Sequence, residues 1–154
     1  MNSNKYSSLV KEILEHINLP QNAVVADLGC RDAGFLLNLQ QAFPDKIKSA
    51  VGVDINDKGF KNVKYKKPIK LEVMNCAKKL EFTDNTFDFV FTKDMFECVS
   101  DKEFLVSEIH RILKPGGVVI CVNCDWDSVA YNGENKELIS KAIHAYAVTK
   151  QPWM

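Results

Sequence analysis

The segment Val24-Val25-Ala26-Asp27-Leu28-Gly29-Cys30-Arg31-Asp32-Ala33-Gly34-Phe35-Leu36 decides the fold. An apolar run carrying one acid is followed by a glycine, a short polar loop, a second glycine and an amphipathic stretch. This order is typical of a buried strand, a tight turn and the start of a helix. Ligands of open α/β sheets bind at the carboxyl ends of strands, where such turns lie. We therefore expect a binding site at this turn.

The residue types in this turn indicate the chemistry of the ligand. Gly29 allows the backbone to turn sharply and to approach a ligand closely. The free N–H groups at the start of the following helix favour a carboxylate, and Asp27 favours an amine. The turn therefore predicts a ligand with an amino-acid moiety. The alternative is an ordinary strand–turn–helix unit that binds nothing, since a fold does not imply a function.

Length and charge limit the class of protein. The chain has 154 residues, which fits one domain, and 46% of them are hydrophobic, which is enough for a core. Its 20 basic and 20 acidic residues balance, so charge gives no argument for nucleic acid or for an anionic membrane. No apolar run has the length of a membrane span, and the first residues lack a signal peptide's apolar stretch. We expect a cytoplasmic protein that binds neither nucleic acid nor a membrane.

The cysteines favour free thiols over a metal site. Their number is odd and they are spread over apolar segments, which is typical of a reducing compartment. They are Cys30, Cys76, Cys98, Cys121 and Cys124. The last two form a CxxC pair, but no second pair of ligands accompanies them. We therefore predict no metal site and interpret the cysteines as small core residues.

Hydrophobic periodicity predicts strands that alternate with helices. Apolar positions at helical spacing predict helices over residues 6–17, 34–43, 101–113 and 134–149, with Asp101 as the cap of the third. Apolar runs predict strands over residues 23–28, 49–54, 69–74, 87–92 and 118–122, the last preceded by a turn at 114–117. Most of these runs are continuous, which implies burial on both faces. The predicted fold class is α/β, with a doubly wound, mostly parallel sheet of about five strands.

Asp54 extends the predicted site. It ends the second predicted strand as Asp27 ends the first. An acid at this position accepts hydrogen bonds from both hydroxyls of a ribose. The alternative is an acid that only caps the next turn. Together, Asp27, Gly29 and Asp54 predict a nucleoside site with an amino-acid end.

Four short motifs follow one another along the chain: Ala26–Cys30, Val51–Asp54, Leu80–Asp88 and Ile112–Gly117. In order and spacing they resemble the motifs of class I S-adenosylmethionine-dependent methyltransferases, within the branch that includes the small-molecule "type 11" enzymes. The resemblance extends from Val24 to Trp126. It implies a Rossmann-like fold with strand order 3-2-1-4-5, an N-terminal and a C-terminal helix, and methyl transfer from S-adenosylmethionine to a small-molecule acceptor.

The resemblance also implies which residues bind the cofactor and the substrate. The first motif would hold the methionine end, the acid of the second strand the ribose, and the segment after the third strand the adenine. The end of the fourth strand would face the sulfonium and the substrate. The implied cofactor-binding residues are Asp27, Gly29, Cys30, Arg31, Asp54, Ile55, Cys76, Ala77, Thr92 and Lys93, and the implied substrate candidate is Asp94. Loops at this end of a sheet commonly carry substrate contacts, so Tyr6 and Trp126 are further substrate candidates; the alternative for Trp126 is a side chain that only covers the sheet. No catalytic residue is implied.

Three departures from the family pattern concern the same site. Arg31 and Ala33 stand where the family usually has glycines; we expect Arg31 to avoid left-handed dihedral angles and either to meet the cofactor carboxylate or to crowd the site. Cys76 replaces an acid that commonly binds the adenine amino group, and a thiol is a weaker partner. Cys98 replaces a histidine of many relatives, which removes a base, although positioning supplies much of the rate of methyl transfer.

Three functions are compared on these residues. The first is the methyltransferase implied by the resemblance. The second, favoured by the three departures, is a catalytically impaired relative that acts by binding or by protein contacts. The third is a nicotinamide-dependent oxidoreductase, whose glycine fingerprint would fall on Gly29, Arg31 and Gly34. Arginine at its middle position blocks close approach to a pyrophosphate, so we set this function aside.

The C-terminal end of the chain predicts an open sheet edge. Family members usually add two further strands after the last predicted helix, and no residues remain for them after Met154. We expect residues 1–154 to form a single methyltransferase-like domain that is shortened at its C-terminus. The predicted strand 118–122 is apolar and has no charge or proline, so it invites pairing with another chain. We expect a homo-oligomer through this strand, or a C-terminal helix folded over it.

Overall fold

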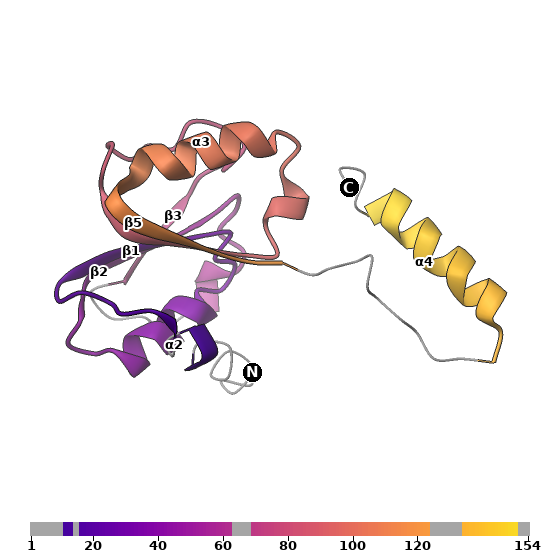
Figure 1. Ribbon diagram of the computed structural model, residues 1–154, viewed down its shortest axis with the longest axis horizontal. Coiled ribbons are helices and arrows are strands. Elements are labelled where there is room, and N and C mark those ends of the chain that lie inside the picture. Colours follow the sequence, from indigo (N-terminus) through magenta and orange to yellow (C-terminus); the bar gives the residue numbers. More distant parts are fainter. Residues whose placement is uncertain (1–10, 14–15, 63–68, 124–133, 151–154) are drawn as a thin grey trace.

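A computed structural model describes residues 11–13, 16–62, 69–123 and 134–150 of the chain. Five strands in this part form one sheet in the order β3-β2-β1-β4-β5, and every neighbouring pair is parallel (Figure 1). The strands are β1 (Ala23–Leu28), β2 (Ile47–Asp54), β3 (Ile69–Val73), β4 (Phe87–Lys93) and β5 (Leu113–Val122). The predicted parallel sheet and its strand order 3-2-1-4-5 are confirmed.

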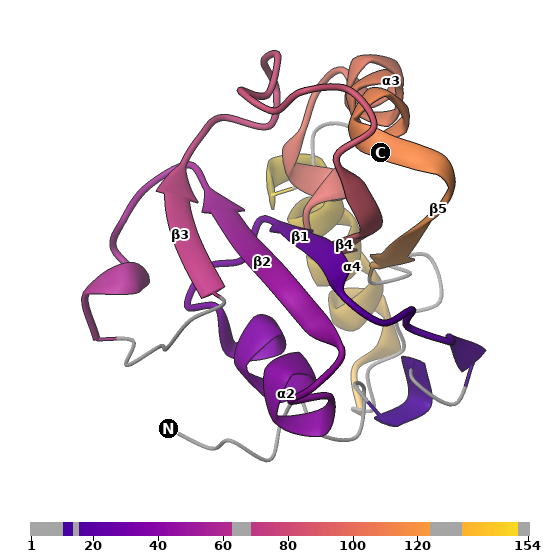
Figure 2. The same cartoon turned by 90° about the vertical axis from the view of Figure 1, so that its left-hand side faces the viewer.

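Helices cover both faces of the sheet. Figure 2 shows β3 at one edge of the sheet, with α2 and α3 on opposite sides of it. The helices are α2 (Gly34–Ala42), α3 (Lys102–Ile112) and α4 (Lys136–Lys150), with 3-10 turns η1 (Phe60–Asn62) and η2 (Phe96–Cys98). Residues 11–13 and 16 are helical, residue 17 is not, and residues 6–10 and 14–15 of the predicted N-terminal helix lie outside the described residues.

Two apolar clusters, one on each face of the sheet, form the core. On the α2 face, Leu36 and Leu39 of the helix pack with aromatic residues of β4, and the rings of Phe35 and Phe91 are 4.8 Å apart. On the α3 face, Leu105 and the other apolar residues of the helix pack over β1, β2 and β4. The three central strands are therefore buried on both faces, as their continuous apolar runs predict.

Side-chain hydrogen bonds attach α3 to the segment that precedes β4. The predicted cap is confirmed, because a carboxylate oxygen of Asp101 accepts a hydrogen bond of 2.9 Å from the backbone N–H of Phe104. Glu108 is buried and accepts from the backbone N–H of Leu80 at 2.8 Å. Arg111 binds Glu108 and also donates to the carbonyl of Leu80 at 3.0 Å. These bonds fix the position of α3 against the sheet.

Strand β5 differs from its prediction in length and in burial. It begins at Leu113, which pairs with Phe87, and regular pairing resumes at Val118 after a register shift. The predicted turn at 114–117 is therefore a bulge inside the strand, where Gly116 takes a φ of +78°. Val118 and Val119 are more than two-fifths exposed, because no described strand lies on the outer side of β5.

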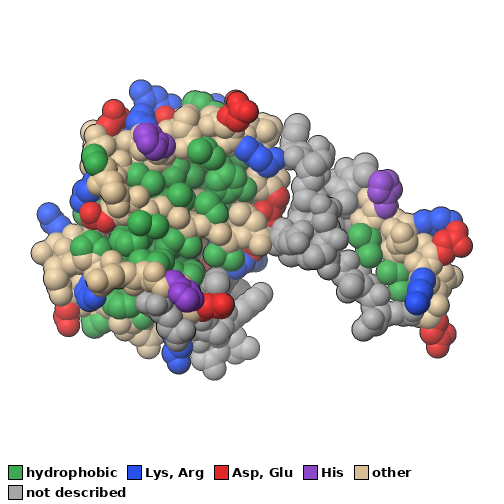
Figure 3. Space-filling view, in the orientation of Figure 1, with side chains coloured by type: hydrophobic (Ala, Val, Ile, Leu, Met, Phe, Trp, Pro, Cys, Tyr) green, Lys and Arg blue, Asp and Glu red, His purple; other side chains and the backbone are tan. Residues whose placement is uncertain are grey.

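Helix α4 also differs from its prediction. Its amphipathic pattern predicts a buried apolar face, but none of its side chains described over residues 136–145 is buried, and Leu138 is 63% exposed. The reason is its position: Figure 1 shows α4 standing apart from the sheet. In the space-filling view, hydrophobic side chains gather on the side of the molecule where β5 runs, and α4 does not cover them (Figure 3).

Candidate cofactor site

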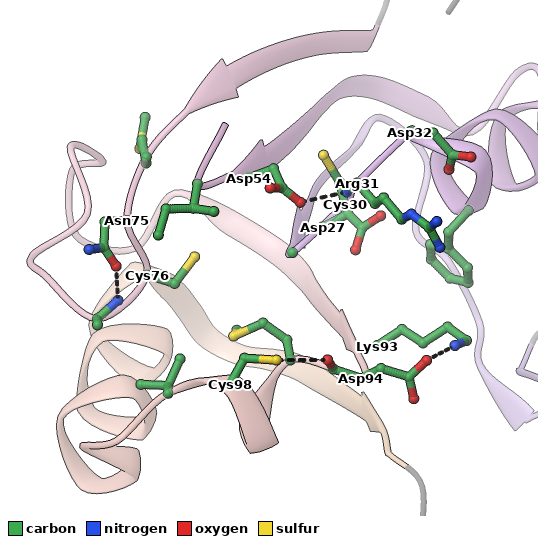
Figure 4. Close-up of a pocket in the computed structure, with 17 residues that line it drawn as sticks. Asp27, Cys30, Arg31, Asp32, Asp54, Asn75, Cys76, Lys93, Asp94 and Cys98 are labelled. Carbon is green, nitrogen blue, oxygen red and sulfur yellow. Dashed lines mark hydrogen bonds and ion pairs between the residues drawn. The ribbon is translucent and has the colours of Figure 1, made fainter. Parts of the chain in front are cut away.

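A cavity of about 470 Å³ lies at the carboxyl ends of β1, β2 and β4 (Figure 4). Its volume is in the range of small-molecule sites. The structure brings most of the predicted cofactor residues together on its wall, with the substrate candidate Asp94. These cofactor residues are Asp27, Gly29, Cys30, Arg31, Asp54, Ile55, Cys76, Ala77 and Lys93.

Thr92 is the predicted cofactor residue that does not line this cavity. Its side chain lies on the same face of β4 as Val90, toward α3, because side chains alternate along a strand. It is 1% exposed, and its hydroxyl is a buried polar atom without a hydrogen-bond partner among the residues that the structure describes. The substrate candidates Tyr6 and Trp126 lie outside the described residues.

Several lining residues were not predicted from the sequence. They are Asp32, Phe35, Met74, Asn75, Met95 and Val99, whereas Cys98, which also lines the cavity, is one of the three departures noted from the sequence. Most of them stand within a few positions of a predicted residue, and this neighbourhood is the signal that could have found them. Met95 is different, because a Cβ on Gly29 would lie 2.8 Å from its Cγ. That contact joins the turns after β1 and β4, which only the assembled sheet brings together.

Main-chain hydrogen bonds attach the turn after β1 to the end of β2. The N–H groups of Gly29 and Cys30 donate to the carbonyl of Val53 at 2.8 and 2.9 Å. Gly29 takes a φ of +80°, as its predicted role in a sharp turn requires. The turn is therefore positioned by main-chain bonds to a neighbouring strand as well as by its own glycine.

The expectation that Arg31 avoids left-handed dihedral angles is wrong. Its φ is +52°, and that of Ala33 is +53°. The chain thus keeps glycine-like conformations with residues that carry a Cβ, at a cost of about 1–2 kcal/mol each. The N–H of Arg31 donates to Asp54 at 2.8 Å, which holds the main chain in this conformation. Such strain persists only where the surrounding structure imposes it.

Asp54 presents its carboxylate at the mouth of the cavity. One oxygen accepts from Arg31 N–H at 2.8 Å (Figure 4), and the other oxygen accepts from Asn56 N–H at 3.4 Å. A carboxylate has about four acceptor positions, so capacity remains for hydroxyl groups of a ligand. Two backbone bonds orient the group before any ligand arrives.

Asp27 lies deeper in the same wall and is 3% exposed. Burial, together with the negative charges of Asp54 and Asp32, raises the pKa of its carboxyl group to about 7, and the positive charge of Lys93 opposes this rise. The group is therefore partly protonated near neutral pH. A cationic ligand group favours its ionised form, because opposite charges attract strongly where water is excluded.

The thiols on the cavity wall are neutral at physiological pH. Burial raises the pKa of Cys30 well above its ordinary value and that of Cys76 to about 11. A thiol in this state is a poor nucleophile and a weak hydrogen-bond donor. Among the residues that the structure describes, no group of His, Cys, Asp and Glu is arranged to hold a metal ion.

A charged pair lies on the cavity wall at the carboxyl end of β4. Lys93 and Asp94 form an ion pair, and both side chains are partly exposed. Asp94 has a φ of +51°, held by its N–H bond to the Val122 carbonyl at 2.8 Å. The Cys98 thiol donates to the Asp94 carbonyl at 3.7 Å (Figure 4). This turn brings one acid and one cation to the wall opposite Asp54.

The fold and the site define a class of protein. A parallel sheet in the order 3-2-1-4-5, with carboxylates at the ends of β1 and β2 around one cavity, is a Rossmann-like architecture of the kind that binds nucleosides. Residues 26–121 match a family model described as a methyltransferase domain. The chain therefore belongs to the class I S-adenosylmethionine-dependent methyltransferases.

Individual relatives and structures agree with this assignment. The chain is 31% identical over 115 residues to phosphoethanolamine N-methyltransferase 3 of Arabidopsis thaliana, covering 71% of the chain and 23% of that protein. It is 30% identical over 116 residues to demethylmenaquinone methyltransferase of Staphylococcus epidermidis, covering 73% and 47%. The chain thus spans less than half the length of these curated relatives.

Solved structures support the fold. A SAM-dependent methyltransferase from Aquifex aeolicus superimposes with a TM-score of 0.67 at 17% identity, over 96% of this chain and 88% of that one. A methyltransferase in complex with the Trm112 activator of Haloferax volcanii gives a TM-score of 0.68 at 24% identity, over 77% and 53%. No helix in the described residues has the length and hydropathy of a membrane span.

The cavity fits the cofactor of this family. S-adenosylmethionine carries an ammonium, a carboxylate, a sulfonium and two ribose hydroxyls. The cavity offers a buried carboxylate for a cation at Asp27, a preoriented carboxylate for hydroxyls at Asp54, and a cation at Arg31. These donors and acceptors match the ligand's groups in kind.

Proposed function

We propose that this protein transfers a methyl group from S-adenosylmethionine to a small-molecule acceptor. One observation carries the proposal: Asp27 and Asp54 face one cavity at the carboxyl ends of β1 and β2, in a chain of this family. S-adenosylmethionine supplies, when bound, a methyl group activated on a sulfonium. The residues of the protein contribute by binding this group, by orienting it and by excluding water from it.

Each wall of the cavity has a proposed task. Asp27 holds the ammonium and Asp54 the ribose hydroxyls, since these carboxylates are buried and preoriented respectively. The adenine of the cofactor lies between Ile55, Cys76 and Ala77. Cys76 supplies an apolar wall rather than a strong hydrogen-bond acceptor, because its thiol stays protonated. The affinity for the cofactor therefore depends more on its ribose and its amino-acid end than on its adenine.

The acceptor side is proposed at the end of β4. Lys93 and Asp94 line the cavity there, and Asp94 offers the carboxylate nearest to the strand end. The relatives' names mention phosphoethanolamine, demethylmenaquinone and sterol as acceptors, which are all small molecules. A small-molecule acceptor agrees with the chain's zero net charge, which offers no general attraction for nucleic acid.

Calorimetric titration with S-adenosylhomocysteine tests the cofactor assignment. We expect saturable binding by the natural chain and a loss of about 1.5–3 kcal/mol in binding free energy for Asp54→Ala, because hydrogen bonds to a charged acceptor are lost. Asp57→Ala is the matched control, since Asp57 is an exposed acid three positions away that pairs with Lys61 and does not line the cavity. Equal affinities for both variants would refute the ribose assignment.

A second candidate is a relative that binds the cofactor without turnover. It is favoured by Cys98, whose thiol stands on the cavity wall with a raised pKa and so offers no base. Thiol alkylation separates occupancy from turnover: S-adenosylhomocysteine should slow alkylation of Cys98 and leave the exposed Cys121, which lies outside the cavity, unchanged. Protection without methyl transfer to any small molecule supports this candidate.

Two further properties belong to the proposal. Self-association through β5 is supported by the exposure of Val118 and Val119 at this sheet edge. A cytoplasmic location is supported by the free thiols of the described cysteines, which persist in a reducing compartment.

A further inference from the structure

The segment after β2 makes a main-chain contact with residues 29–33, the turn after β1, which we call the cofactor loop. None of the sequence motifs indicates this contact. A Cβ built on Gly59 would lie 2.0 Å from the carbonyl oxygen of Arg31, 2.6 Å from its carbonyl carbon and 3.1 Å from the backbone nitrogen of Asp32. All three are backbone atoms, which cannot rotate away as a side chain does. The backbone at Gly59 therefore rests directly on the backbone of the cofactor loop.

The contact falls on the strained part of that loop. Arg31 has a φ of +52°, an unfavourable conformation for a residue with a Cβ. Its N–H donates to Asp54, and its carbonyl side is covered by Gly59. Arg31 is thus held on one side by a hydrogen bond and on the other by steric contact.

The segment that carries Gly59 is itself folded by local bonds. Asn56 accepts from Lys58 N–H through its side-chain oxygen at 3.0 Å, and Phe60 N–H donates to the Asp57 carbonyl at 3.0 Å. These bonds form a compact turn, and the turn presents its glycine to the cofactor loop. The turn begins directly after Asp54 and Ile55, so it is anchored at the cofactor site.

From this geometry we propose that Gly59 is a positioning residue: it locks the Arg31 main chain, and with it the Asp54 carboxylate, in the arrangement that binds the cofactor. The inference rests on the proposed function for its consequence. Gly59 does not line the cavity. It acts through Arg31, whose N–H orients the carboxylate. A Cβ at position 59 would clash with this backbone, so the loop or the turn that carries position 59 must move, and the contact that locks Arg31 is lost.

Gly59→Ala tests the proposal by two measurements. Amide hydrogen exchange should accelerate at least tenfold at Arg31, because its bond to Asp54 is broken, while Gly29 and Cys30 keep their bonds to Val53 and their protection. Affinity for S-adenosylhomocysteine, measured by calorimetry, should fall at least tenfold. If amide hydrogen exchange at Arg31 is unchanged, Gly59 does not lock the Arg31 main chain. If this exchange accelerates while the affinity is unchanged, the lock has no role in cofactor binding.

Gly116→Ala is the matched control. Gly116 has a φ of +78° with nothing within 4 Å of its missing Cβ, so the substitution strains the bulge of β5 and lowers the melting temperature without reaching the site. Its affinity should stay within about twofold of the natural chain. An equal loss of affinity in both variants would show that Gly59 acts through general stability, and would overturn the proposal.

A milder variant covers the case in which Gly59→Ala does not fold. Asn56→Ala removes the acceptor of Lys58 N–H and loosens the turn without any clash. The same two changes are expected at smaller size, and their absence counts against the lock. A natural chain that binds no S-adenosylhomocysteine refutes the proposed function, whereas the exchange at Arg31 still decides the lock.

Discussion

At the residue scale, the site depends on groups held in unfavourable states by their neighbours. Asp27 is buried with a raised pKa, Arg31 and Asp94 have positive φ angles, and Thr92 buries an unpaired hydroxyl. Each state costs free energy that the rest of the core must offset. Substitutions at these positions therefore separate binding from stability.

The pKa of Asp27 predicts two opposite effects of pH. The folded chain binds this proton more tightly than the unfolded chain, because its pKa rises from 3.8 to about 7. The contribution of Asp27 to the stability of the unliganded chain should therefore decrease as pH rises from about 4 to about 7. Affinity for S-adenosylhomocysteine should change in the opposite sense and fall below pH 7, because its ammonium prefers the ionised carboxylate.

Urea unfolding and calorimetry over this pH range measure both effects. Asp27→Asn is the control, since an amide does not titrate: it should remove most of the slope in stability and in affinity between pH 4 and 7. A natural chain whose affinity is constant from pH 6 to 8 would show that Asp27 does not face the ammonium.

Thr92→Val should increase the free energy of unfolding by about 1 kcal/mol, because a methyl group replaces a buried hydroxyl that has no partner in the described part of the chain. Thr86→Val is the control with the opposite sign, since the Thr86 hydroxyl donates to the Thr83 carbonyl at 2.7 Å. Chemical denaturation measures both. A Thr92→Val chain that binds S-adenosylhomocysteine much more weakly would instead identify this hydroxyl as the cofactor contact that the family resemblance implies.

At the scale of elements, α3 is attached to the sheet by a charged network as well as by its apolar stripe. Arg111 donates to Glu108, to the carbonyls of Leu80 and Phe82, and to Asp84. The hydrogen bond from Arg111 is the largest cause that lowers the pKa of Glu108. The network fixes the segment before β4, and so the strand that carries Lys93 into the site.

Arg111→Ala should lower the free energy of unfolding by roughly 2–4 kcal/mol, because it leaves the buried Glu108 carboxylate without its cation. The remaining bond from Leu80 N–H is too little to satisfy this group. Lys141→Ala is the control on α4, where an exposed pair with Glu137 contributes about 0.5 kcal/mol or less. Thermal and urea unfolding measure both variants. Equal, small losses in the free energy of unfolding would contradict the role of the network in attaching α3 to the sheet.

At the scale of the whole molecule, the sheet ends in an apolar strand that nothing described covers. Val119 of β5 is 42% exposed, and α4 stands apart from this edge (Figure 1). The natural chain should therefore associate with itself as its concentration rises. Val119→Lys should shift it toward the monomer, because a charge at an edge strand opposes pairing.

Light scattering over a concentration series measures this association. Val106→Lys is the control, since Val106 is a 53% exposed valine that lies on helix α3 and not on an edge strand. It should leave the molar mass unchanged. A natural chain that stays monomeric at every concentration would contradict pairing through β5.

The sequence by itself determined the sheet, its strand order through the family resemblance, and the acids at the ends of β1 and β2. These are local properties, because apolar runs, glycines and strand-ending acids are readable within a few residues of one another. Tertiary structure alone decided the positive φ of Arg31, the face on which Thr92 lies, the early start of β5 and the exposure of α4. It also decided the contact of Gly59 with Arg31. These features arise from bonds and contacts between segments far apart in the chain, and such contacts exist only after the sheet has assembled.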